Sequence, residues 1–159
     1  MKKLLLIRHA RATHESGFKD FERPLVESGL KDAAVMASRL KENKHIPQIL
    51  ISSPALRTIS TANVFTQHLA IPHAQTNEVI YEASVYSLVK VINDASAAND
   101  FIGLVGHNPG ISELLYYFTG QMQDVPTCAM MLIEFDTDDW ASITSDDGKL
   151  TYYDYPKKG

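Results

Sequence analysis

In the stretch KLLLIRHA, residues 3–10, an apolar run gives way to a cation and an imidazole, and the fold can be predicted from this change. Its apolar centre, residues 4–7, is uninterrupted, as in strands that helices cover on both faces. Arg8 and His9 follow directly, so a buried strand is expected to end on a cation and an imidazole. The apolar run is also too short for the core of a signal peptide, since it ends at Arg8.

Two further apolar runs resemble the first. QILI, residues 48–51, precedes Ser52-Ser53-Pro54, and FIGLV, residues 101–105, precedes Gly106-His107-Asn108-Pro109-Gly110. Between the runs lie helical patterns, and we expect helices at residues 29–41, 54–69, 86–97 and 111–118. This alternation predicts an α/β fold with a mostly parallel sheet and helices on both of its faces.

The remaining strands are predicted from weaker patterns. A short strand is expected at residues 78–81. Residues 130–135 and 141–144 are expected to form an antiparallel hairpin at the edge of the sheet, joined through residues 136–140. The polar stretch before the first helix, residues 10–23, has no clear period and predicts a loop.

Composition limits the classes of function. The 159 residues are 45% hydrophobic and 21% charged, which predicts one globular domain over residues 1–159. A net charge of -4 without a basic block argues against nucleic acid or a membrane surface as a partner. Cys128 is the only cysteine, so we expect a small buried side chain and neither an intrachain disulfide nor a thiolate metal cluster. A cytoplasmic protein is expected.

The carboxyl ends of parallel strands meet at one edge of a sheet, where open α/β folds bind ligands. Arg8, His9 and His107 should therefore lie together, with Arg57 one helical turn beyond the second strand. Arginine offers planar donors that match phosphate oxygens, and helix N-termini attract the same anion. An imidazole there can form a covalent phosphohistidine, and a second, if protonated, can stabilise the transition state. This chemistry requires no metal, nucleotide or other cofactor.

The sequence resembles the histidine phosphatase superfamily in three segments that follow one another in the family's order: Arg8-His9-Ala10, Ser53-Pro54-Ala55-Leu56-Arg57-Thr58 with Thr61, and Gly106-His107-Asn108-Pro109. The first corresponds to the family's RHG motif, with Ala10 in place of glycine. The compact size, with Arg23-Pro24-Leu25 before the first helix, is similar to the small SixA-type phosphohistidine phosphatases. The resemblance extends from Leu4 to about Leu115.

This resemblance implies a three-layer α/β/α sandwich, a compact form of the phosphoglycerate mutase-like fold, and a two-step phosphoryl transfer. His9 would be the nucleophile, and Arg8, Arg57 and His107 would hold the phosphoryl oxygens. Arg23 and Asn108 are further candidates for substrate binding. The acid that protonates the leaving group stays open between two carboxylates, Asp20 and Glu82.

The chain lacks the long insertions that enclose the sites of phosphoglycerate mutases and acid phosphatases. An open pocket suits a phosphorylated protein side chain, such as that of a histidine-containing phosphotransfer domain, better than a small sugar phosphate. We therefore expect a metal-independent phosphohistidine phosphatase. The alternatives are a phosphomonoesterase that acts on small molecules through the same His9, and a phosphate-binding module without turnover.

Overall fold

The computed structural model describes residues 1–157, and its strands form one six-stranded sheet with the order β3-β2-β4-β1-β5-β6. The strands are β1 (Lys2–Arg8), β2 (Ile49–Ser52), β3 (Gln75–Thr76), β4 (Phe101–Gly106), β5 (Met130–Phe135) and β6 (Gly148–Asp154). The first four strands in this order run parallel, whereas β5 and β6 pair antiparallel at the other edge. The predicted fold class, including the antiparallel edge hairpin, is confirmed.

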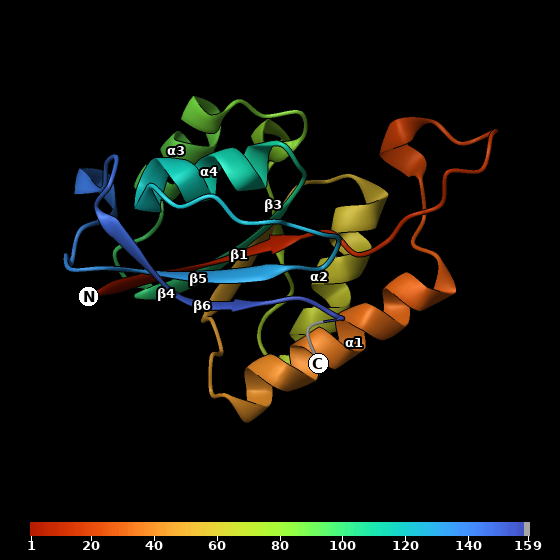
Figure 1. Ribbon diagram of the computed structural model, residues 1–159, viewed down its shortest axis with the longest axis horizontal. Helices are drawn as coiled ribbons and strands as arrows, with labels where there is room; N and C mark the ends of the chain where they lie inside the picture. The colour runs from red at the N-terminus through yellow and green to blue at the C-terminus, as the bar shows by residue number, and fades with distance from the viewer. Residues whose placement is uncertain (158–159) are drawn as a thin grey trace.

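Four helices cover the sheet on its two faces (Figure 1). They are α1 (Glu27–Glu42), α2 (Leu56–Leu69), α3 (Val85–Asn93) and α4 (Gly110–Thr119). Alternate residues of β1 point to opposite faces. Leu5 and Ile7 pack in a cluster with α1 and α2, while Leu4 and Leu6 pack in a second cluster with α3 and α4. The uninterrupted apolar run of β1 is thereby explained, because both of its faces are buried.

The strand predicted at residues 78–81 is wrong. Residues Glu78–Ile80 form a single turn of 3₁₀ helix, and the strand of this region is β3, with only two residues. The Asn77 side chain accepts a hydrogen bond from the Val79 N–H and turns the chain. Asparagine at such a position competes with strand pairing, since its short side chain can bond to nearby backbone.

The strand predicted at residues 141–144 is also wrong. Trp140–Ser142 is a 3₁₀ turn, and the last strand is β6, seven residues long. Trp140 is 2% exposed, and its indole N–H donates to the Asn99 carbonyl. Apolar residues in this segment therefore fill the core from a turn. The β6 signal was weaker because exposed and partly buried residues alternate along an edge strand.

Among residues 1–157, no helix combines the length and the apolar character that are needed to span a membrane. Cys128 is buried, as expected, and burial raises the pKa of its thiol.

Candidate active site

The carboxyl ends of β1, β2 and β4 lie at one edge of the sheet. Arg8 pairs in register with Gly106, and Ser52 pairs with Val105. Beyond the strands, the His9 N–H donates to the Gly106 carbonyl over 3.1 Å. The rings of His9 and His107 consequently stand with their centroids 5.5 Å apart. The meeting of the strand ends that the sequence predicted is observed.

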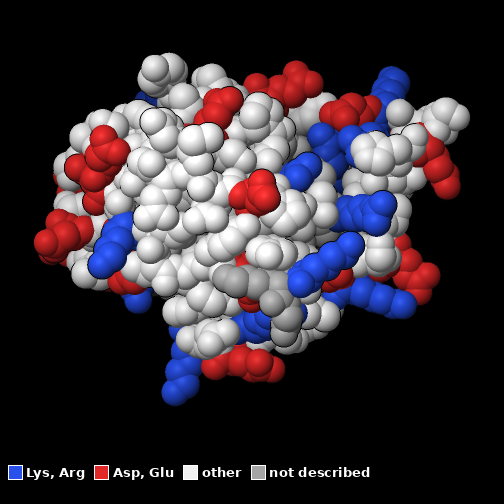
Figure 2. Space-filling model, viewed as in Figure 1, with Lys and Arg blue, Asp and Glu red and all other residues white. Residues whose placement is uncertain are grey.

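A hollow of about 510 Å³ opens at this edge, and its lining includes Arg8, His9, Arg57 and His107. Arg23 and Asn108, the other proposed binding residues, line it as well. Figure 2 shows Lys and Arg side chains gathered on the right-hand side of the molecule, the side on which the segment between β1 and α1 lies in Figure 1. The basic surface is therefore local, in a chain whose net charge is -4.

His9 is 7% exposed, and its Nδ1 lies 2.7 Å from the Ala10 carbonyl oxygen. A carbonyl oxygen only accepts, so Nδ1 carries the ring proton and donates it. Burial, with a smaller contribution from the charges of nearby arginines, lowers the pKa of His9 to about 4 against the opposing effect of the Ala10 bond. The ring is therefore neutral at pH 7, with Nε2 unprotonated and suited to act as a nucleophile.

His107 is fixed through its other nitrogen. Nε2 lies 2.8 Å from Ser53 Oγ, which in turn accepts the Ala55 N–H at the start of α2. Burial, followed by the charge of Arg57, lowers the pKa of His107 to about 3. A neutral His107 that accepts the Ser53 hydroxyl proton at Nε2 carries its own proton on Nδ1. The ring can then donate a hydrogen bond without first becoming charged.

Three buried donors of the site lack a protein partner. Within residues 1–157, the buried side-chain nitrogens without a hydrogen bond are Arg8 Nε, Arg57 Nε and His107 Nδ1. An unpaired buried polar group costs about 1–3 kcal/mol, and more when it is charged. All three belong to residues that line the hollow beside His9. A bound oxyanion is the ligand that such donors match.

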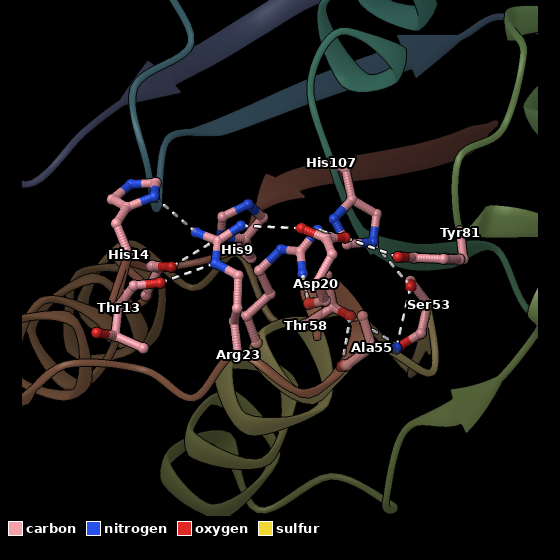
Figure 3. Close-up of polar contacts among 12 residues, drawn as sticks. His9, Thr13, His14, Asp20, Arg23, Ser53, Ala55, Thr58, Tyr81 and His107 are labelled. Atoms are coloured by element: carbon pink, nitrogen blue, oxygen red, sulfur yellow. Dashed lines mark hydrogen bonds and ion pairs between the residues drawn. The ribbon is translucent and has the colours of Figure 1, made fainter. Parts of the chain in front are cut away.

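The side chain of Asp20 connects three residues of the site, and Figure 3 shows its contacts with Tyr81 and Arg23. Its carboxylate accepts from the Tyr81 hydroxyl at 2.7 Å and from Arg23 and Arg57 at 3.1 Å each. The Asp20 carbonyl accepts a further bond from Arg57 at 2.7 Å. The Tyr81 bond, supported by the two arginines, lowers the pKa of Asp20 to about 2. Asp20 is thus ionised at neutral pH and holds Arg57 in place.

Sequence reasoning missed Tyr81. Its ring packs edge-on against His107 at a centroid distance of 5.6 Å, and its bond to Asp20 raises the pKa of its hydroxyl to about 12. Tyr81 follows the 3₁₀ turn that was predicted as a strand, and the sequence contains no pattern that pairs it with Asp20, 61 positions away. Only the tertiary structure reveals this contact.

Glu82, the other candidate acid, is exposed and lines a second hollow of about 350 Å³, which also borders His107. The Asn108 side chain is already hydrogen-bonded to protein groups, because Oδ1 accepts from Ser112 and Nδ2 donates to the Val125 carbonyl. Among residues 1–157, no cluster of three or more His, Cys, Asp or Glu side chains is arranged to hold a metal ion.

The family model of the histidine phosphatase superfamily (branch 1) matches residues 4–85, more than half of the chain. The chain belongs to this superfamily.

The fold is similar to solved structures of SixA proteins. A protein of Agrobacterium tumefaciens assigned as phosphohistidine phosphatase SixA has a TM-score of 0.83 and 21% identity, with 96% of each chain covered. The protein histidine phosphatase SixA in complex with tungstate has a TM-score of 0.80 and 20% identity, with 97% of each chain covered. A phosphoserine phosphatase of Entamoeba histolytica has a TM-score of 0.68 and 16% identity, with 96% of each chain covered. At these identities the likeness shows the fold.

Two relatives match by sequence. An uncharacterised chloroplastic protein of Arabidopsis thaliana is 26% identical over 152 residues, which cover 87% of this chain and 69% of the relative. An uncharacterised protein of Mycobacterium tuberculosis is 28% identical over 109 residues, which cover 68% of this chain and 66% of the relative. The chain therefore spans about two thirds of the length of each relative.

Proposed function

We propose that this chain is a phosphatase that hydrolyses phosphohistidine in proteins through a covalent phosphohistidine on His9. The observation that carries the proposal is the group of unpartnered donors beside the unprotonated Nε2 of His9. The donors match phosphoryl oxygens, and Nε2 is the nucleophile that such a bound group would meet.

In the first step, His9 Nε2 attacks phosphorus, the bond from phosphorus to the substrate nitrogen breaks, and the leaving imidazole takes up a proton. Arg8, Arg57 and His107 stabilise the charge on the equatorial oxygens. In the second step, water attacks phosphorus, the bond to Nε2 breaks, and inorganic phosphate leaves with one proton lost from the water. His9 returns to its neutral form, with Nδ1 still bonded to the Ala10 carbonyl.

The state of the candidate acids favours phosphoramidate over ester substrates. A placed acid typically contributes about 10²–10⁴-fold to the departure of a poor leaving group such as an alcohol. Asp20 is held ionised, since its pKa is about 2, and Glu82 is exposed and lines the adjoining hollow rather than the one that His9 lines. An imidazole that leaves from phosphohistidine depends less on this help, because its nitrogen can be protonated by solvent.

The proposal is tested by steady-state rates on a phosphohistidine peptide and on p-nitrophenyl phosphate, for the wild-type protein and for His9→Ala. We expect a clear preference for the peptide in the wild type, and a loss of turnover of roughly a thousand-fold or more in His9→Ala. His73→Ala is the matched control, because His73 is exposed and lies outside the hollow. Circular dichroism checks that each variant is folded.

Different results would support the other readings. A preference for the ester would indicate a phosphomonoesterase that acts on small molecules through His9. Tight binding of phosphate without turnover of either substrate would indicate a phosphate-binding module. Turnover that persists in a folded His9→Ala variant would remove His9 as the nucleophile.

A further inference from the structure

The catalytic hollow carries more positive charge than one phosphoryl group needs. Its lining includes five basic side chains, Arg8, Arg11, Arg23, Arg57 and Lys157, and one carboxylate, Asp32. Asp20 neutralises part of the charge of Arg23 and Arg57. Arg11 and Lys157 remain, and within residues 1–157 neither the Arg11 guanidinium nor the Lys157 ammonium has an ion-pair or hydrogen-bond partner.

Arg11 is held in place by its backbone. Its carbonyl accepts the Val26 N–H over 3.0 Å, and the next residue, Ala12, forms an isolated bridge with Leu25. Gly29 allows α1 to approach, because a Cβ at that position would lie 2.3 Å from the Arg11 carbonyl oxygen. The fold therefore fixes the backbone and leaves the cationic side chain exposed at the hollow.

Lys157 reaches the same hollow from the other end of the chain. Arg39 of α1 anchors the segment after β6 by donating to the carbonyls of Tyr155 at 3.0 Å and Pro156 at 3.3 Å. Tyr155 and Pro156 line the hollow together with Lys157. Two cations from distant parts of the sequence thus face one opening without partners of their own.

We propose that Arg11 and Lys157 form a cationic rim that selects phosphoproteins whose phosphohistidine is flanked by acidic side chains. This inference rests on the proposed function and names the chemistry of its substrate. Complementary charges at an interface raise association rates and discriminate between partners, and in a protein of net charge -4 an acidic partner would otherwise be repelled. A hollow of about 510 Å³ also leaves room for residues beside the phosphoryl group.

The test uses three phosphohistidine peptides of equal length whose flanking residues are acidic, neutral or basic. We expect kcat/KM of the wild type to be highest for the acidic peptide and lowest for the basic one. A single exposed ion pair contributes little to binding, and we therefore remove both cations together. Arg11→Gln/Lys157→Gln should lower kcat/KM on the acidic peptide by about five- to twenty-fold. On the neutral peptide and on phosphoramidate the change should stay within about two-fold, since the phosphoryl contacts are intact.

The matched control is Lys41→Gln/Lys149→Gln, which removes the same charge from exposed positions outside the hollow and should leave the preference unchanged. High salt should reduce the advantage of the acidic peptide in the wild type, because it screens exposed charges. Equal rates on the three peptides would overturn the proposed role of the rim and leave the proposed phosphatase function standing. An equal loss on phosphoramidate would also overturn it, since the two cations would then act on the phosphoryl group itself.

One result separates this inference from the proposed function. A wild-type protein that hydrolyses none of the peptides but does hydrolyse an ester would overturn the function, and the rim with it. If the rim variant instead lost as much rate on a small bis-phosphate as on the acidic peptide, the rim would serve small polyanions and the protein-substrate assignment would be wrong.

Discussion

Within the site, single hydrogen bonds decide which atoms are available for chemistry. The Ala10 carbonyl holds the proton of His9 on Nδ1, and burial keeps the ring neutral, so Nε2 stays open. Asp20 is the opposite case, because the Tyr81 hydroxyl and two guanidinium groups keep it charged. Neutral imidazoles and an ionised carboxylate thus lie side by side, and their surroundings rather than their residue types determine the difference.

For a single residue of the site, we predict the effect of Tyr81→Phe. The variant removes the donor that contributes most to the low pKa of Asp20, while the ring can keep its contacts with His107 and Phe21. The pKa of Asp20 should rise from about 2 toward its ordinary value, and Arg57 should be held less firmly. We expect kcat/KM on a phosphohistidine peptide to fall by about three- to ten-fold.

Titration of the Asp20 carboxyl by NMR reports the first effect, and steady-state kinetics report the second. Tyr86→Phe is the control, since Tyr86 is 76% exposed at the start of α3. An unchanged Asp20 titration in Tyr81→Phe would contradict the assigned role of the hydroxyl.

Among the elements, β1 and α2 are connected at the site by one threonine. Thr61 Oγ1 accepts the Ala10 N–H at 2.9 Å and donates to the Arg57 carbonyl at 2.7 Å. Both partners neighbour proposed functional groups, since the Ala10 carbonyl orients His9 and Arg57 faces the hollow. The helix therefore sets the position of the nucleophile as well as that of the cation.

Thr61→Val should destabilise the protein by about 1–3 kcal/mol, because it leaves the buried Ala10 N–H without an acceptor. It should also lower kcat, since the Ala10 carbonyl is then held less firmly against His9. Thr66→Val is the matched control on the same helix, because the Thr66 hydroxyl donates only to the carbonyl of Asn63 in its own helix. Urea unfolding and kinetics measure both effects, and equal losses in the two variants would contradict the connection.

Over the whole molecule, the sheet buries two histidines in neutral form. An unfolded histidine has a pKa near 6.5, whereas those of His9 and His107 in the folded protein are about 4 and about 3. As the pH falls below about 6.5, the unfolded chain binds protons that the folded protein does not. The contribution of these two histidines to the unfolding free energy is therefore fully present above that pH and is lost progressively as the pH falls toward 4.

We predict that the unfolding free energy falls between pH 6.5 and 4 with a contribution of about 1.4 kcal/mol per pH unit from each of these histidines. His9→Asn/His107→Asn should flatten the dependence of the unfolding free energy on pH in this range, because asparagine does not titrate. Urea unfolding in buffers without phosphate measures the unfolding free energy at each pH. Parallel curves for the variant and the wild type would show that the two rings do not titrate as expected.

The meeting of the strand ends at the site could be predicted from the sequence because the signal is local. Uninterrupted apolar runs ending on Arg8-His9 and Gly106-His107 define buried parallel strands, and such strands place their carboxyl ends together. The short strand at 78–81 and the strand at 141–144 could not be predicted correctly, because side-chain bonds from Asn77 and Asp139 turn those segments where apolar content alone predicts extension.

By itself, the sequence determined the α/β class, the buried strands of the sheet and the candidate residues His9, Arg8, Arg57 and His107, since each follows from the order of residues along a few turns or strands. Tertiary structure decided the hydrogen-bond partners and the protonation states of those residues. The bond from Tyr81 to Asp20 and the placement of Arg11 and Lys157 around one hollow bring together segments far apart in the chain. Burial sets the protonation of His9 in the same way, because it depends on what packs around a group in space.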